Sequence, residues 1–161
     1  MTVDVNIFDY ASVSRATRRL DEYYADLIEK ANELCRRLAE IGKVRAELDF
    51  SNAIYDGTND VSVSQVEPID NGYAIHATGN AVLFIEFGSG VIGAGHPEQE
   101  GYGPGTWSDG PNGKGHWQDP GGWYYRHGEK SIGNPPAAAM YHAKQDVLQE
   151  VQRIADEVFA R

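Results

Sequence analysis

Residues 20–41, LDEYYADLIEKANELCRRLAEI, contain the pattern that decides the fold of this 161-residue chain. Apolar side chains recur there at alternating spacings of four and three residues, at Leu20, Tyr24, Leu27, Ala31, Leu34, Leu38 and Ile41. A 3.5-residue apolar period places them on one face of an α-helix. We therefore predict a long amphipathic helix that begins near Val13, with Ser12 or Ser14 as N-cap, and ends at Gly42. Its apolar face can pack on a sheet or pair with a second helix in a coiled coil.

The segment that follows predicts a β-hairpin. Apolar and polar residues alternate over Val61–Val66 and again over Tyr73–Ala77, and the intervening residues 68–72, PIDNG, are typical of a turn. An additional strand over Glu47–Ile54 is expected to pair with this hairpin. The result would be a small antiparallel sheet with one face on the long helix.

Two further helices are predicted towards the C-terminus. The apolar run Ala81–Phe87 lies between Asn80, a good N-cap, and Gly88, a good stop, and is expected to form a short buried helix. Asn134 as cap and Pro135 at the first helical position open a second long helix. Its apolar face comprises Met140, Tyr141, Val147, Leu148, Val151, Ile154, Ala155, Val158 and Phe159.

Residues 88–133 differ in composition from the rest of the chain, because they hold 14 of the 18 glycines and all three tryptophans. So many glycines prevent the segment from forming a core, and its length exceeds that of ordinary loops, so it is either disordered or a docking arm. Disordered segments are poor in aromatic residues, so the tryptophans favour an arm, with a short strand over Gly122–His127. We predict one α+β domain over residues 1–161, with residues 88–133 as an arm inserted into it.

Composition opposes several functional classes. Residues 46–113 contain ten acidic and no basic side chains, so this segment lacks the cations that bind nucleic-acid phosphates. The N-terminus has no signal-peptide pattern, and no apolar run approaches the length that spans a bilayer, so a soluble protein is expected. The single cysteine, Cys35, excludes an internal disulfide and is expected in the core.

The histidines do not have the spacing of a metal site. His96, His116 and His127 could meet only if the arm brings them together, and no metal or cofactor is predicted.

Glu86 is the carboxyl group with the clearest alternative roles, because Ile85 and Phe87 enclose it in the sequence. One role is that of a general acid, with Asp109 or Asp119 as the second carboxylate and the arm tryptophans stacking on sugar. The role we favour is structural, in which Glu86 accepts hydrogen bonds from backbone amides or pairs with an arginine at a subunit contact.

The order of these parts is more specific than any single one. After the long helix and the hairpin come residues 81–90, AVLFIEFGSG, then His96-Pro97, the run 122–125, GWYY, and Pro135-Pro136 before the last helix. This arrangement resembles the HK97 gp10-like family of tailed-phage proteins over roughly residues 10–160. The family usually reads a-x-F-I/V-E-F-G-T-G, and here Ser89 takes the position of the threonine. The family also commonly has a phenylalanine after the proline, whereas residues 137–140 here are AAAM.

The resemblance implies a non-enzymatic virion protein that acts in head–tail joining or tail completion as part of a ring. Its partners would be further copies and other phage neck or tail proteins, and it would assemble in the host cytoplasm. The implied subunit interface comprises Phe84, Glu86, Phe87, Gly88, Trp107, Trp117, Trp123, Tyr124 and Tyr125. DNA would pass as repelled cargo through a lumen lined by Asp56, Asp60, Glu67 and Asp70. The alternative is a carbohydrate-active enzyme or lectin-like module that uses Glu86 and the arm tryptophans.

Overall fold

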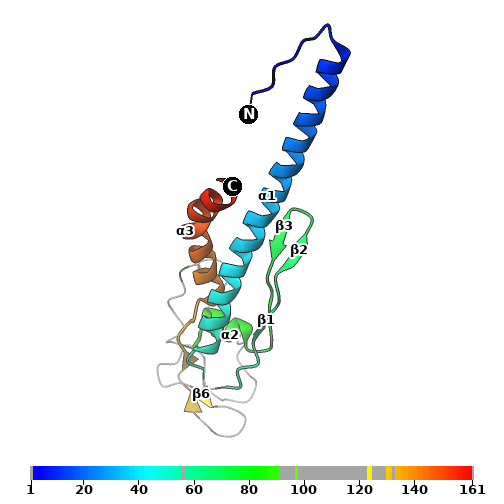
Figure 1. Ribbon diagram of the computed structural model, residues 1–161. Helices are drawn as coiled ribbons and strands as arrows, with labels where there is room; N and C mark the ends of the chain where they lie inside the picture. The colour runs from blue at the N-terminus through cyan, green and yellow to red at the C-terminus, as the bar shows by residue number, and fades with distance from the viewer. Residues whose placement is uncertain are drawn as a thin grey trace.

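The computed structural model describes residues 2–55, 57–90, 97, 123–124, 130–131 and 133–160. Its α+β architecture confirms the predicted class (Figure 1). The helices are α1 (Tyr10–Ser51), α2 (Val82–Phe87) and α3 (Ala139–Phe159). The strands are β1 (Ser62–Val63), β2 (Glu67–Ile69), β3 (Gly72–Ala74), β4 (Ala77–Thr78), β5 (Ser89–Gly90), β6 (Trp123–Tyr124), β7 (Lys130–Ser131) and β8 (Gly133–Asn134). They form the antiparallel pairs β1–β4, β2–β3, β5–β8 and β6–β7.

Helix α1 is longer than predicted at both ends. Its N-cap is Asp9, whose carboxylate accepts a hydrogen bond from the backbone N–H of Ala11 at 3.0 Å, so neither predicted serine caps it. The predicted stop at Gly42 and the predicted strand over Glu47–Ile54 are both wrong, because the helix continues to Ser51. A continuous helix presents one apolar face of residues 42–50 to α3 and α2, which a strand in this place could not do.

Gly42 lies where α1 and α3 pack most closely. A Cβ atom at this position would lie 3.1 Å from Cγ2 of Val147, so glycine is present for close approach and not for a helix stop. Gly42→Leu is expected to push the helices apart and lower the free energy of unfolding by about 2 kcal/mol. In Gly42→Ala the gain in helix propensity offsets the cost of the tight contact in the free energy of unfolding. Urea unfolding of both variants tests this, and a leucine variant as stable as the parent contradicts it.

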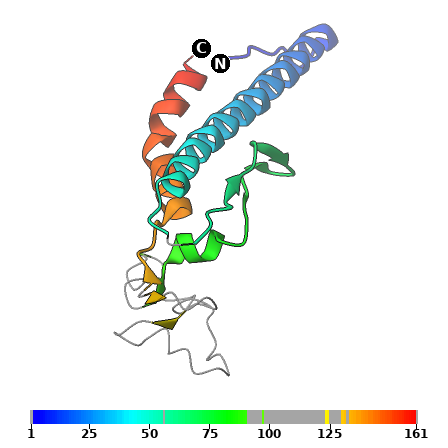
Figure 2. The same ribbon diagram turned by 90° about the horizontal axis from the view of Figure 1, so that it is seen from below.

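The predicted hairpin forms, but its turn is shorter than predicted, because Pro68 and Ile69 belong to β2 and Gly72 to β3. Strands β2 and β3 pair with Glu67 opposite Ala74 and Ile69 opposite Gly72, and the turn lies at residues 70–71. The ladder resumes in β1 and β4, and between the two parts the N–H of Ser64 donates to the carbonyl of His76 at 2.8 Å. The hairpin and α3 lie on different flanks of α1 (Figures 1 and 2).

The main core lies where the C-terminal end of α1, α2 and the start of α3 meet. It consists of Ala46, Phe50, Ala81, Ile85, Ala139 and Ala143. Because four of these six are alanine, the helices approach closely but bury little apolar surface per residue. Cys35 is exposed, so its predicted place in the core is wrong. The packed body is gathered at one end of α1, and the N-terminal half of the helix extends beyond it (Figure 1).

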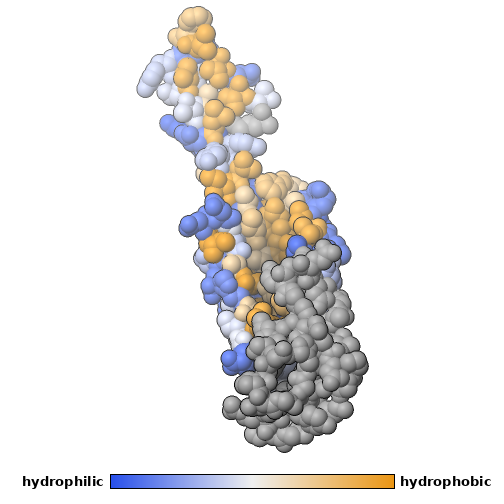
Figure 3. Space-filling model, turned by 180° about the vertical axis from the view of Figure 1, so that it is seen from behind, coloured by the Kyte–Doolittle hydropathy of each residue, from blue (hydrophilic) through white to orange (hydrophobic). Residues whose placement is uncertain are grey.

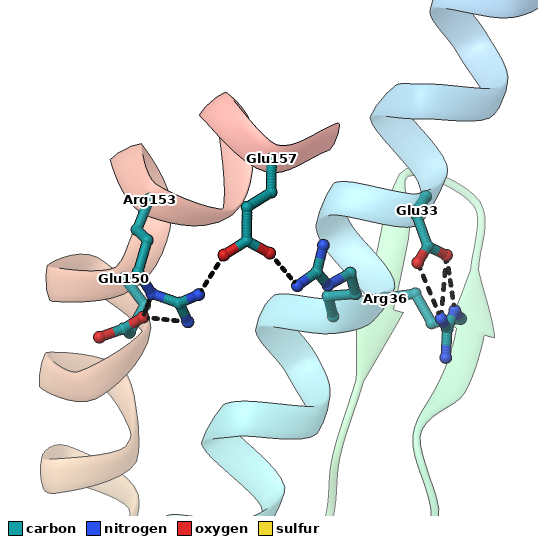
Figure 4. Close-up of polar contacts among 6 residues, drawn as sticks. Glu33, Arg36, Glu150, Arg153 and Glu157 are labelled. Carbon is teal, nitrogen blue, oxygen red and sulfur yellow. Dashed lines mark hydrogen bonds and ion pairs between the residues drawn. The ribbon is translucent and has the colours of Figure 1, made fainter. Parts of the chain in front are cut away.

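A chain of ion pairs joins the far end of α3 to the middle of α1 (Figure 4). Arg37 on α1 donates to Glu157 on α3 at 2.5 Å, and Glu157 also pairs with Arg153 at 2.6 Å. Arg153 in turn pairs with Glu150. The hydrogen bond from Arg37, and then that from Arg153, hold the pKa of Glu157 below its ordinary value. These pairs lie at the surface, with Arg37 and Glu157 half-buried, and they orient the two helices while adding little stability.

Helix α3 begins later than predicted. Asn134 is not its cap and Pro135 is not its first residue, because the helix starts at Ala139 after Ala138, which has a left-handed φ of +49°. The N–H groups of Ala137 and Ala138 instead donate to the carbonyls of Ile85 and Glu86, at 2.7 and 3.1 Å. Residues 137–138 therefore provide hydrogen-bond donors for carbonyl groups at the C-terminal end of α2 before the chain enters α3.

None of the helices among the described residues combines the length and the apolar character needed to cross a bilayer.

Candidate functional site

Glu86 connects α2 to the start of α3. Its side chain is buried, and its carboxylate oxygens accept hydrogen bonds from the N–H groups of Met140 and Tyr141 at 3.0 and 3.3 Å. Since Ala138 offers no side-chain cap, Glu86 supplies acceptors and a negative charge to the N-terminus of α3. Of the roles left open for Glu86, the structure shows bonding to backbone amides. The carboxylate is thereby engaged inside its own subunit.

Asp60 likewise supplies hydrogen-bond acceptors to the N-terminus of α2. One carboxylate oxygen accepts from the N–H of Ala81 and the other from both the N–H and the side-chain amide of Asn80, each at 2.9 Å. Asn80 was predicted to cap α2, but that prediction is wrong because the acceptor comes from Asp60. The hydrogen bond from the backbone of Asn80, followed by that of Ala81, lowers the pKa of Asp60. Asp60 therefore supports the start of α2 while it remains exposed, and its place in a lumen stays a prediction.

The lowered pKa of Asp60 predicts a pH dependence of stability. Its contribution is complete above the ordinary aspartate pKa of about 3.9 and is lost as the pH falls through the lower, folded-state value. Asp60→Asn is therefore expected to lower the melting temperature at neutral pH and to converge with the parent in acid. Asp70→Asn is the matched control, because Asp70 is exposed at the hairpin turn. Thermal unfolding across pH tests this, and an Asp60→Asn curve that parallels the parent contradicts it.

The base of the arm is a defined structural unit, which we call the neck: strands β5 and β8. Ser89 pairs with Asn134 and Gly90 with Gly133, so the chain leaves and returns at one point. The Ser89 hydroxyl donates to the side-chain oxygen of Asn134, and the amide of Asn134 donates to the carbonyl of Phe84 at 2.8 Å. Gly88 has a φ of +73°, a conformation that glycine adopts readily, and it turns the chain from α2 into the neck.

The neck explains two features of the sequence, the position of Asn134 and the serine at residue 89. Asn134 is buried and ties both neck strands to α2, which is why it does not cap α3. Ser89 keeps the hydroxyl donor that a threonine would also provide at this position.

The predicted interface residues do not all meet. Phe84 and Phe87 lie half-buried on α2 beside the buried Glu86, and Trp123 and Tyr124 form β6, which pairs with β7. Of the predicted lumen residues, Glu67 and Asp70 are exposed on the hairpin. The remaining residues lie outside the described part of the chain: Trp107, Trp117, Tyr125, Asp56, the paired acids Asp109 and Asp119, and the histidines His96, His116 and His127. Among the residues that the structure does describe, no three His, Cys, Asp or Glu side chains converge as metal ligands would.

Sequence reasoning missed an apolar tip at the free end of α1, formed by Ile7, Phe8 and Tyr10. These side chains are 74%, 94% and 88% exposed. Further apolar side chains are exposed along the same half of the helix: Leu20, Tyr23, Tyr24, Leu27 and Ile28. Figure 3 shows apolar side chains at this end of the molecule. For the exposed side chains along the helix, the 3.5-residue period was an available signal, since its first turns have no partner in the body. Ile7 and Phe8 precede the helix and gave no such signal.

A second apolar feature lies on the body, where α1, the hairpin and α3 enclose a groove of about 410 Å³. We call it the three-element groove. Its walls include Leu38 from α1, Tyr73 and Ile75 from the hairpin segment, and Met140 and Val147 from α3. Cys35 also lines the groove, and its exposed thiol lies there beside apolar side chains.

Comparison with known proteins gives no match to a protein-family model, a curated protein or a solved structure.

Proposed function

We propose that this chain is a structural subunit of a tailed-phage or prophage particle that acts in head–tail joining or tail completion. One observation carries the proposal: a long helix projects from a small body with its apolar side chains exposed. Contiguous exposed apolar surface of this kind marks an interaction site. Burial of the projecting half of α1 therefore comes from neighbouring molecules.

The neck supports the same function. Because β5 and β8 are paired and tied to α2 through Asn134, the arm is attached at a fixed point on the body. An arm held in this way can reach a neighbouring subunit while the body keeps its fold. A contact of this type, repeated around an axis, closes into a ring.

The contacts of Glu86 favour a structural role over the glycan-directed alternative. Its carboxylate accepts hydrogen bonds from two backbone N–H groups of α3, which accounts for its burial without a role as general acid.

Genetic removal and particle analysis test the proposed function. The gene is deleted in the phage or prophage that carries it, and particles are separated on a density gradient. We expect unjoined heads and tails, and restoration of infectious particles by a tagged copy that co-sediments with them. Complete, infectious particles without the protein would overturn the proposal.

A further inference from the structure

We propose that the apolar tip of one copy docks in the three-element groove of the next copy. This inference rests on the proposed function and identifies the surfaces through which neighbouring subunits meet. It is drawn from the exposure of the tip, the apolar lining of the groove and the charges beside each.

The tip has the properties of an interface anchor. Phe8 and Tyr10 are among the most exposed side chains of the molecule, and large aromatic side chains dominate binding when a pocket receives them. Asp9 fixes their place by capping α1, and the side chain of Asn6 accepts from the N–H of Phe8 at 3.1 Å. The turn before the helix is thus held by local hydrogen bonds, so little conformational freedom is lost on docking.

The groove offers a matching receptor. Its walls come from three different elements and are largely apolar, and it opens on the flank of α1 that carries Leu38. A tip and a groove on the same molecule cannot meet each other here, because the straight helix α1 separates them (Figure 1). They can meet only between copies, and such a contact is heterologous and propagates into a ring or a filament.

Charges of opposite sign are available beside the two surfaces, although acids also flank the tip: Asp9 pairs with Arg15, and Asp4, Asp21 and Glu22 are near in the sequence. Residues 10–20 contain three arginines and no acid, and Arg18 and Arg19 form no ion pair with any described residue. The hairpin that walls the groove carries Glu67 and Asp70, both exposed and without an ion pair in the described ranges. Opposite charges flanking an apolar contact select the partner and its register. This contact places Glu67 and Asp70 between subunits.

Other basic side chains near the groove do not reverse this complementarity. Arg36 pairs on its own helix with Glu33 (Figure 4) and with Glu40 at 2.5 Å, so its charge is balanced locally. Lys144 also lines the groove and has an interaction of its own within the chain.

The single native cysteine provides the test, because Cys35 lines the groove. In Ile7→Cys, which keeps the aromatic anchors Phe8 and Tyr10, the new thiol of one copy should reach Cys35 of the next. A short bismaleimide is then expected to produce a ladder of dimers, trimers and higher species on a denaturing gel. The matched control is Ile54→Cys, which replaces an equally exposed isoleucine away from the tip and should give about tenfold less of the higher species. Combining Ile7→Cys with Cys35→Ser should remove every species above the dimer.

Reversal of the charges beside the tip and beside the groove tests independently whether the two surfaces meet in the proposed register. In the Ile7→Cys background, Arg18→Glu with Arg19→Glu should reduce the ladder about tenfold, as should Glu67→Arg with Asp70→Arg. Mixing the two reversed proteins should restore the ladder, because each tip then meets a groove flanked by the opposite charge. All four changes in one chain should restore it as well. Circular dichroism of each variant shows that it is folded.

The outcomes separate this inference from the proposed function. No ladder from folded Ile7→Cys at any concentration, or a ladder unchanged by charge reversal, would overturn the contact. A charge-dependent ladder from a protein that is dispensable for particles would support the contact and overturn the phage role. Incorporation into particles unaffected by both charge reversals would support the phage role and overturn the contact.

Discussion

Replacing Glu86 with alanine is expected to lower the free energy of unfolding by about 3 kcal/mol. The substitution removes the acceptors for the N–H groups of Met140 and Tyr141, which lie in a part-buried environment at the start of α3. It also removes a negative charge from a helix N-terminus. Because Ala138 cannot cap α3 with its side chain, no neighbouring residue in the sequence replaces Glu86.

Chemical unfolding of two variants isolates this effect. Glu86→Gln keeps an acceptor oxygen but not the charge, so its loss of stability should fall between those of the parent and Glu86→Ala. Glu67→Ala is the surface control and should remain within about 0.5 kcal/mol of the parent. If Glu86→Ala is as stable as Glu67→Ala, the capping role of Glu86 is wrong.

Deleting the arm is expected to abolish function while preserving the fold. Gly90 and Gly133 are paired in the neck, so residues 91–132 can be replaced by an Asn-Gly turn without separating β5 from β8. The core residues of α1, α2 and α3 all lie outside the deleted segment. The shortened protein should therefore unfold cooperatively, and it should be absent from particles.

The two readouts of the arm deletion report on different parts of the proposal. Cooperative thermal unfolding shows that the body is independent of the arm, whereas its loss would show the arm to be part of the core. A folded deletion variant that still enters particles at the parental level would contradict the role of the arm in assembly.

The elements with strong local signals were predictable from the sequence. The 3.5-residue period marked α1, the PIDNG turn marked the hairpin, and the run bounded by Asn80 and Gly88 marked α2. In each case the pattern is local, because the periodicity or the turn chemistry acts within one element.

The caps were not predictable because they come from distant residues. Asp60 caps α2 from 21 residues before Ala81, and Glu86 reaches α3 across 54 residues to Met140. Standard capping rules look only at the residues beside a helix, so they selected Asn80 and Asn134 instead. The prediction that α1 ends at Gly42 was wrong for a related reason. A glycine that ends a helix and a glycine that allows a second helix to pack closely cannot be distinguished from the sequence alone.

The candidate site was predicted in part. The acidic hairpin and the arm were visible in composition, but the hydrogen bonds by which Asp60 and Glu86 cap helices are shown only by the tertiary structure. The tip was missed because Ile7 and Phe8 precede the helix and belong to no periodic pattern.

The most direct measurement of the central claim is a cryo-EM reconstruction of the head–tail junction of intact particles. The account predicts a closed ring of several copies of this chain, with the projecting half of each α1 buried against a neighbouring subunit. A junction in which this chain is absent, or in which single copies sit with that half of α1 exposed to solvent, would contradict it.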